Sequence, residues 1–232
     1  MALKDDLTNE VGLVFRSGWT ETTGRVVPTP SDVGLGNKAT LLEQAVVFYA
    51  DLDGSTNMVD KKKWEFSAEI YKAFLHCAAK IIKAESGDIT AYDGDRIMAI
   101  FIGNNKHDRA VRAALRLRWA ITNIIEPCMK EIYTTTDLSI KHTVGIDSSD
   151  LRAVRTGVRG DNDLVWVGSA ANYAAKLNTL SSDFPTWITK AVYDGLSSNL
   201  KISNTQSVWE PRLWTAMNNM PIYCSTWHMG IS

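Results

Sequence analysis

Two aspartates stand where strands are predicted to end, and their chemistry is that of cation ligands. Asp51 follows the apolar run Ala45–Tyr49, and Asp95 follows Asp93-Gly94, a dipeptide typical of β-hairpins. Two carboxylates brought to one place repel each other unless a positive charge lies between them. Oxygen ligands suit Mg²⁺ or Mn²⁺, and two such ions would also neutralise a triphosphate. The pair therefore predicts a site for two divalent cations.

The segment after Asp51 predicts a phosphate-binding turn. Gly54 allows the backbone to approach a ligand closely, and Ser55 and Thr56 open a predicted helix whose first N–H groups are free. In the alternative interpretation Gly54 only makes a turn, and the two hydroxyls cap the helix. Asp53 is expected to shape the turn rather than to bind a metal.

The elements around these residues follow from hydrophobic periodicity and turn signals. Strands are predicted at 44–51, 89–92, 96–102, 138–147, 152–158, 164–167 and 187–188, and helices at 56–84, 107–129 and 168–180. Strand, helix, hairpin, helix, strand is the order of the ferredoxin-like βαββαβ pattern in an α+β domain. That topology runs the third strand antiparallel beside the first, which would bring Asp51 and Asp95 together.

Three parts of the chain differ in character. Residues 1–41 are predicted to form an arm, since glycines and prolines interrupt any long element there. Its apolar residues, among them Phe15 and Trp19, are expected to pack on the domain or on a second subunit. Residues 42–190 make the central domain, and residues 191–232 an extension packed on it.

Bulk composition sets limits on partners and location. The 232 residues carry a formal net charge of −1, which gives no argument for a nucleic-acid or membrane-surface partner. No apolar run reaches about 18 residues and no signal peptide is recognisable, so a cytoplasmic protein is expected. The three cysteines lack ligand spacing and are expected to be reduced, buried thiols.

Three motifs in the correct order resemble those of the class III nucleotidyl cyclases. Tyr49–Thr56 is similar to the first metal motif of that family, and Tyr92–Phe101 to the second. Gly168–Leu177 resembles their Gly-x-x-x-Asn-x-x-x-Arg helix, and Val144–Asp147 the strand leading toward it. The resemblance spans about residues 42–182.

The resemblance implies a role for each matching residue. Asp51 and Asp95 would bind two metal ions, assisted by the carbonyl of Leu52, and Asn172 would position the ribose. Lys176 stands where the family usually has an arginine that contacts the phosphates, so the charge is kept but the bidentate fork is lost. In the family the metal aspartates and this helix come from different subunits, which implies a head-to-tail homodimer with two composite sites.

The positions that recognise the base depart from the purine cyclases. The polar pair used by those enzymes is replaced here by Ala91 and Val165, which cannot hydrogen-bond a purine edge with their side chains. Tyr49 and Trp166 are bulky enough to suit a one-ring base, and Arg96 could donate to a pyrimidine carbonyl. The alternatives are ordinary strand packing for the two aromatic residues and a surface position for Arg96.

The arm strengthens the pyrimidine interpretation. Trp19, Gly24–Pro28 and Leu35–Asn37 resemble the N-terminal region of bacterial pyrimidine cyclases of the Pycsar anti-phage system. This implies conversion of UTP or CTP to the 3′,5′-cyclic monophosphate and pyrophosphate, with the product activating a separate effector protein. UTP is favoured, although no residue decides between the two nucleotides.

Two other functions remain open from the sequence. Lys176, Ala91 and Val165 would also fit a cyclase domain that binds nucleotide without catalysis. Asp51–Ser55 resembles the first motif of haloacid-dehalogenase-type phosphatases, in which the first aspartate is a nucleophile. That family needs alternating βα units, and the Asp93-Gly94 hairpin interrupts them.

Overall fold

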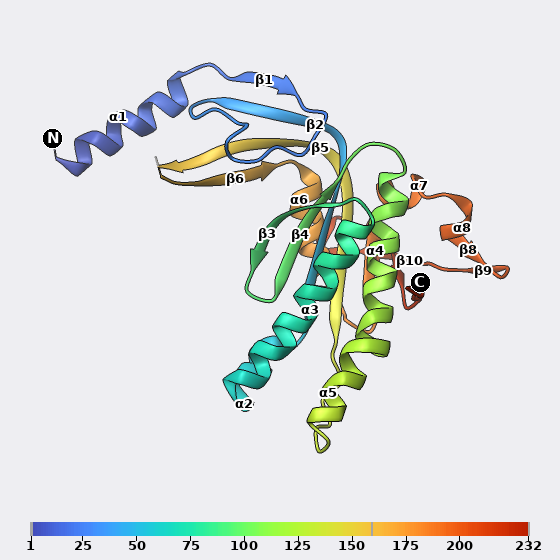
Figure 1. The fold of residues 1–232 in the computed structure, drawn as a ribbon. Coiled ribbons are helices and arrows are strands. Elements are labelled where there is room, and N and C mark those ends of the chain that lie inside the picture. Colours follow the sequence, from blue (N-terminus) through green and yellow to red (C-terminus); the bar gives the residue numbers. More distant parts are fainter. Residues whose placement is uncertain (1, 159, 232) are drawn as a thin grey trace.

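The computed structural model describes residues 2–158 and 160–231. Figure 1 shows one twisted sheet with α3 and α4 packed across one face and α6 behind the other. The strands are β1 (Thr20–Thr23), β2 (Lys38–Leu52), β3 (Asp88–Asp93), β4 (Arg96–Phe101), β5 (His142–Val158), β6 (Asp161–Val167), β7 (Thr186–Thr189), β8 (Ile202–Ser203), β9 (Gln206–Ser207), β10 (Glu210–Trp214) and β11 (Met220–Ser225). The helices are α1 (Leu3–Arg16), α2 (Ser55–Lys61), α3 (Trp64–Ala84), α4 (Lys106–Ala120), α5 (Glu126–Ile132), α6 (Ser169–Leu177), α7 (Lys190–Asp194) and α8 (Ser198–Lys201). A π-helical stretch (Ile121–Ile125) joins α4 to α5, and a 3-10 turn (Thr215–Met217) follows β10.

The centre of the sheet has the predicted ferredoxin-like arrangement. The strand order is β10-β11-β7-β5-β2-β4-β3, with β1 beside β2 and β6 beside β5. Strands β2 and β4 run antiparallel, with Tyr49 opposite Met98 and Ala50 opposite Ile97. The α+β fold and the pairing expected to join the two aspartates are therefore confirmed.

Alternation along β2 separates two apolar layers. Val46, Phe48 and Ala50 are fully buried in the core beneath α3 and α4. Val47 and Tyr49 belong to the smaller cluster on the α6 face. Because successive side chains of a strand point to opposite faces, Asp51 lies on the same face as Tyr49.

A glycine in β5 lets α6 pack close to the sheet. Gly145 lies opposite Tyr49, and a Cβ atom at Gly145 would lie 2.1 Å from the carbonyl oxygen of Ala174. One step along β5, the Thr143 hydroxyl donates a 2.9 Å hydrogen bond to the carbonyl oxygen of Asn178, just after α6. These contacts fix α6 on the face that carries Tyr49 and Asp51.

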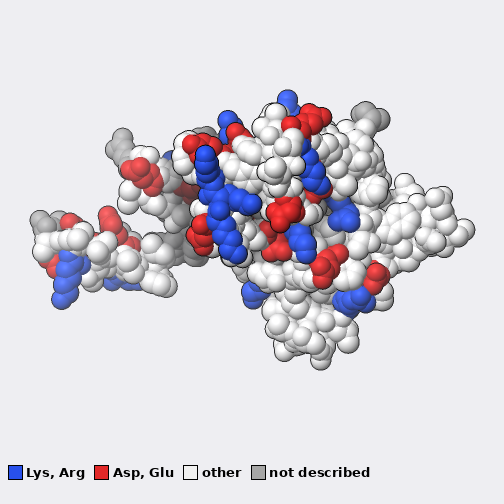
Figure 2. All heavy atoms as spheres, turned by 90° about the horizontal axis from the view of Figure 1, so that it is seen from below, with Lys and Arg blue, Asp and Glu red and all other residues white. Residues whose placement is uncertain are grey.

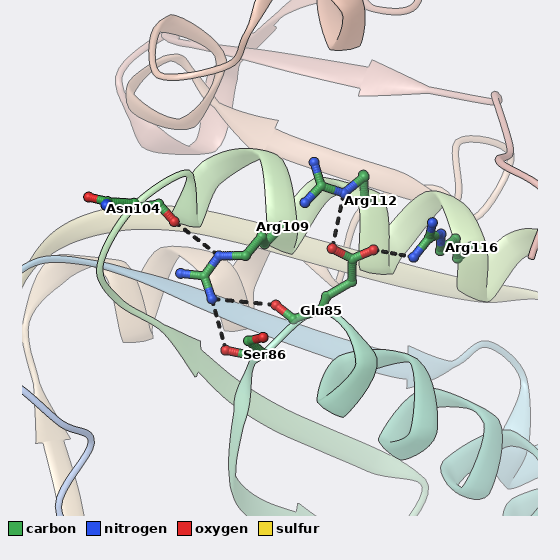
Figure 3. A network of polar contacts seen from close by, with 6 residues as sticks. All are labelled: Glu85, Ser86, Asn104, Arg109, Arg112 and Arg116. Carbon is green, nitrogen blue, oxygen red and sulfur yellow. Dashed lines mark hydrogen bonds and ion pairs between the residues drawn. The ribbon is translucent and has the colours of Figure 1, made fainter.

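A buried carboxylate joins the ends of α3 and α4 (Figure 3). Glu85, only 5% exposed, accepts from Arg112 at 3.0 Å and from Arg116. Arg109 donates to the backbone carbonyl of Ser86 at 3.0 Å. Three arginines on one helix thus hold the loop that leads into β3, and thereby the hairpin that carries Asp95.

Several predicted boundaries were wrong, including the start of β2, which is Lys38 rather than residue 44. The helix predicted at 56–84 is two helices, α2 and α3, because the backbone is extended at Lys62 and Lys63. The strands predicted at 138–147 and 152–158 are the single strand β5, which begins only at His142. Residues 148–151, which lay between the two predicted strands, stay in the sheet because Asp150 accepts hydrogen bonds from the backbone and side chain of Gln44 at 2.9 and 3.0 Å.

The N-terminal segment contains a helix that was not predicted. Helix α1 ends at Arg16, just before Gly18, and none of its residues is buried. Asn37 anchors its end by donating to the carbonyl oxygens of Val14 and Ser17 at 2.8 and 2.7 Å. Farther along, Val33 is buried, so part of the arm packs on the body while α1 reaches away from it (Figure 1).

The C-terminal segment extends the sheet. Strand β11 pairs with β7, β10 pairs with β11, and Trp209 and Trp214 are buried.

Of the three cysteines Cys224 is buried, but Cys77 is half-buried and Cys128 exposed, so the expectation of buried thiols was wrong for Cys128. The helices of the described residues lack the combination of length and apolar character that crossing a membrane requires. On the face seen in Figure 2, acidic and basic side chains are interspersed.

Candidate active site

The two predicted metal aspartates come from neighbouring strands. Asp51 is the penultimate residue of β2, and Asp95 is the second central residue of the two-residue turn between β3 and β4. The turn is Gly94-Asp95 rather than the predicted Asp93-Gly94, because Asp93 already pairs with Arg96. Gly94 has a φ of +60° while Asp95 does not have a positive φ, the pattern of a type II′ hairpin turn.

Asp51 is a partly buried carboxylate held by an arginine. Its Oδ2 atom accepts hydrogen bonds from Nη2 and Nε of Arg96 at 2.9 and 3.2 Å, and its side chain is 19% exposed. Burial raises the pKa of the Asp51 carboxyl. The hydrogen bond and positive charge of Arg96 oppose that shift, and the charge of Asp95 adds to it. Because the net shift of the Asp51 pKa is upward, a further positive charge nearby would stabilise the ionised carboxylate.

One oxygen of Asp95 has no hydrogen-bond partner among the residues that the structure describes. Its Oδ2 atom is buried and forms no hydrogen bond. A buried anionic oxygen left unpaired is costly, and a divalent cation is a natural partner for it. The described residues contain no cluster of three or more His, Cys, Asp or Glu side chains suited to a metal. The two aspartates therefore fit ions that take their other ligands from backbone carbonyls, water and phosphates, as Mg²⁺ commonly does.

The turn after β2 has the predicted glycine, and the capping hydroxyls of the alternative interpretation are not found in the described helix. Gly54 is the N-cap residue of α2 with a φ of +74°, and no side chain caps the helix. Ser55 and Thr56 lie in its first turn, so the alternative in which they cap it is wrong. Asp53 accepts a 2.5 Å hydrogen bond from the Ser182 hydroxyl, which ties the turn to the loop after α6.

Tyr49, Ala91 and Trp166 lie on the α6 face, whereas Val165, next to Trp166 in β6, points to the opposite face. Tyr49 and Trp166 both pack against the same apolar cluster. Burial raises the pKa of the Tyr49 hydroxyl, against the opposing charge of Arg96. Ala91 is exposed opposite Met98, and Val165 is 42% exposed on β6. These positions present apolar surface and one phenol.

Arg96 lies where neither sequence interpretation placed it. It is neither a free surface residue nor free for a base, because it is paired with Asp51. Sequence reasoning missed this contact because 45 positions separate the two residues. The signal was present in the register, since one step beyond the Ala50–Ile97 pair of β2 and β4 brings Asp51 opposite Arg96.

The two residues predicted on α6 point away from their own chain's core. Asn172 and Lys176 are one helical turn apart, and both are exposed. The opposite face is buried through Ala170, Ala171, Ala174 and Leu177. Between residues that the structure describes, no hydrogen bond or ion pair joins Asn172 or Lys176 to Asp51 or Asp95. The ammonium group of Lys176 lies 3.9 Å from Sδ of Met217. One chain thus presents the two halves of the predicted site separately.

A hollow elsewhere in the molecule does not include the two predicted metal ligands. It has a volume of about 730 Å³ and lies between α3 and α5. Its lining is mainly apolar, including Ala73, Ile124 and Met129. Neither aspartate of the pair lines it.

Comparison with known proteins decides the family. The chain is 51% identical over 228 residues to a uridylate cyclase of Burkholderia cepacia, covering 98% of each chain. It is 50% identical over 232 residues to a uridylate cyclase of Xanthomonas perforans, covering all of both. The chain belongs to the uridylate cyclase family. It is therefore a nucleotidyl cyclase, and the predicted resemblance to the bacterial pyrimidine cyclases is confirmed. A scan against family models found no match.

Solved structures place this uridylate cyclase family member among the class III cyclase folds. A bacterial light-regulated adenylyl cyclase superposes with a TM-score of 0.68 at 15% identity, over 84% of this chain and 54% of the other. A guanylyl cyclase gives a TM-score of 0.68 at 13% identity, over 82% and 94%. At such identities the likeness establishes the fold alone. That fold excludes the phosphatase interpretation, which required alternating βα units.

Proposed function

We propose that the protein converts UTP to 3′,5′-cyclic UMP and pyrophosphate, as second-messenger synthesis in anti-phage defence. The observation that carries the chemistry is the convergence of Asp51 and Asp95 at adjoining strand ends, with a buried Asp95 oxygen that lacks a partner. The uridylate cyclases at about half identity support uracil over cytosine. Conversion of CTP to cyclic CMP is the alternative.

The aspartate pair would hold two Mn²⁺ or Mg²⁺ ions, with the Leu52 carbonyl as a further ligand. When bound, such ions lower the pKa of the ribose 3′-hydroxyl and neutralise the triphosphate. The turn at Gly54, Ser55 and Thr56 would receive phosphate oxygens through its free N–H groups. This assignment uses only oxygen donors, which suits these cations.

The exposed residues of α6 complete the reaction. The 3′-hydroxyl releases its proton to water and its oxygen bonds to the α-phosphorus, while the bond from that phosphorus to the bridging oxygen breaks and pyrophosphate leaves with the electron pair. Asn172 would hold the ribose so that its 3′-oxygen faces the α-phosphorus. Lys176 would stabilise the negative charge that develops there.

The proposed base pocket favours a pyrimidine because it lacks the side-chain hydrogen-bonding groups that would recognise a purine. Ala91 and Val165 offer no side-chain hydrogen bond to a purine edge, and an unmatched polar edge is costly to bury. Tyr49 and Trp166 narrow the space beside them. A one-ring base therefore fits this face better than a purine.

The active protein would be a homodimer. Because no hydrogen bond or ion pair joins the exposed Asn172 and Lys176 to Asp51 or Asp95 among the described residues of one chain, a second chain would supply them. Two-fold symmetry then creates two equal composite sites. The cyclic product would activate a separate effector protein.

A substrate panel tests the proposal. Purified protein with Mn²⁺ receives ATP, GTP, CTP or UTP, and the cyclic products are separated by chromatography, with Asp51→Ala as control. We expect cyclic UMP from UTP and none from the variant. Cyclic CMP as the main product would establish the cytidylate alternative. A cyclic purine would contradict the assignment of Ala91, Val165 and Tyr49, and no product from any nucleotide would contradict the proposed activity.

A further inference from the structure

The contact between Arg96 and Asp51 occupies an atom that the proposed metal site needs. Both Nη2 and Nε of Arg96 donate to the same oxygen of Asp51, at 2.9 and 3.2 Å. The pair is half-buried, with 37% of the Arg96 side chain and 19% of the Asp51 side chain exposed. A fork of two charge-assisted hydrogen bonds in such a place is more than a solvent-screened surface contact.

A divalent cation and this arginine would compete for the Asp51 carboxylate. An ion bound there would lie beside the guanidinium, and like charges at that separation repel strongly in a partly buried site. Arg96 does not bridge the two carboxylates, since among the described residues the buried Oδ2 atom of Asp95 accepts no hydrogen bond. Metal binding at Asp51 would therefore be stronger with Arg96 moved away.

The released side chain would remain on the substrate face. Arg96 pairs with Asp93 across the hairpin, and its charge interacts with the Tyr49 hydroxyl. By strand alternation it shares a face with Met98, beside which Ala91 and Tyr49 lie. A nucleoside triphosphate bound over this face would offer the guanidinium a new acceptor, either a base carbonyl or a phosphate oxygen.

We propose that Arg96 is a gate on the metal site: it holds Asp51 while the site is empty and moves to the nucleotide when metal and nucleotide bind together. This inference rests on the proposed metal site at Asp51 and Asp95. The gate makes the two ligands cooperative, because nucleotide removes the competitor of the metal, and linkage requires the converse. Metal ions alone then bind weakly, and the site is filled by metal ions only when the nucleotide is also bound.

Manganese binding without catalysis tests the gate. Free Mn²⁺ is measured by electron paramagnetic resonance for wild type and for Arg96→Gln, Asp95→Asn and Arg212→Gln. Arg212 is the matched control, since it pairs with an exposed acid, Glu210, at 2.7 Å on β10, which three strands separate from β2. Without nucleotide, Arg96→Gln is expected to bind Mn²⁺ at least about tenfold more tightly than wild type. Asp95→Asn should lose binding, and Arg212→Gln should match wild type.

The same titration with α,β-methylene-UTP, which cannot release pyrophosphate, separates a gate from a simple charge effect. The analogue should tighten Mn²⁺ binding in wild type much more than in Arg96→Gln. A mere loss of positive charge would tighten binding equally with and without the analogue and would leave this ratio unchanged. Arg96→Lys, which keeps the charge but loses the fork, should lie between the two.

Each failure has a separate meaning. If Arg96→Gln is folded by thermal melting and binds Mn²⁺ as wild type does, while Asp95→Asn loses binding, the gate is wrong and the metal site stands. An analogue effect of the same size in wild type and Arg96→Gln also overturns the gate. If neither wild type nor Arg96→Gln binds Mn²⁺ with or without analogue, the metal site itself is wrong and the gate falls with it.

Discussion

At the scale of single residues, the empty site contains carboxylates in unfavourable surroundings, which a bound cation would stabilise. Asp95 keeps a buried oxygen without a hydrogen bond, and burial raises the pKa of Asp51 despite its arginine. Such groups lower the stability of an empty protein, so their presence calls for a function. A substitution at Asp95 can therefore separate its effect on protein stability from its effect on metal binding.

Asp95→Asn should separate activity from stability. The amide has nearly the same shape but carries no charge, so the melting temperature should stay the same or rise slightly. Cyclase activity should fall by at least about a hundredfold, since an amide is a poor ligand for a hard cation. The two are measured by kcat/KM with UTP and by thermal melting. Near-wild-type activity in the variant would remove Asp95 from the metal site.

At the scale of elements, β5 is the scaffold that holds both halves of the site. It pairs with β2 beside Asp51, and its Gly145 admits α6 to within contact. Its first residue, His142, is 3% exposed, and its Nε2 atom has no hydrogen-bond partner. Burial, with a smaller contribution from the charge of Arg118, lowers the pKa of His142 to about 3.

This histidine predicts a loss of stability in mild acid. The unfolded chain binds a proton at His142 below a pH of about 6.5, while the folded protein does not until about pH 3. Stability should therefore be unaffected by His142 above neutrality. It should fall as the pH drops from about 6.5 toward 3, by up to about 1.4 kcal/mol per pH unit. Urea unfolding of wild type and His142→Leu at pH 7.5, 6 and 5 measures this, and equal pH slopes in the two proteins would contradict it.

The elements that positioned the aspartates were predictable because they depend on local patterns. Apolar runs ending in polar turns gave β2, β3 and β4, and the β-hairpin signal gave the turn within one residue. The continuity of β5 was not predictable, because it depends on Gln44 satisfying Asp150 from another strand. For the same reason the Arg96–Asp51 pair was missed, since it needs the register of two strands rather than a local motif.

At the scale of the whole molecule, the chain has features that a second copy would complete. Figure 1 shows α1 and the β5–β6 hairpin reaching out on the same side of the body. Phe15 on α1 is 85% exposed, and Val158 and Val167 on the hairpin are 64% and 53% exposed. The arm was expected to pack on the domain or on a second subunit. Because α1 has no buried residue on its own chain, the second subunit remains as the proposed partner.

The composite site is the central claim, and a pair of tagged heterodimers tests it most directly. Asp51→Ala and Asn172→Ala chains with different tags are co-expressed, and the dimer carrying both tags is purified. In the matched control, wild type is paired with a chain carrying both substitutions. If sites form between chains, the first dimer keeps one intact site of two and about half of wild-type cyclic UMP formation, while the control is inactive. The reverse, with an active control and an inactive first dimer, would mean that each site lies within one chain and would contradict the account.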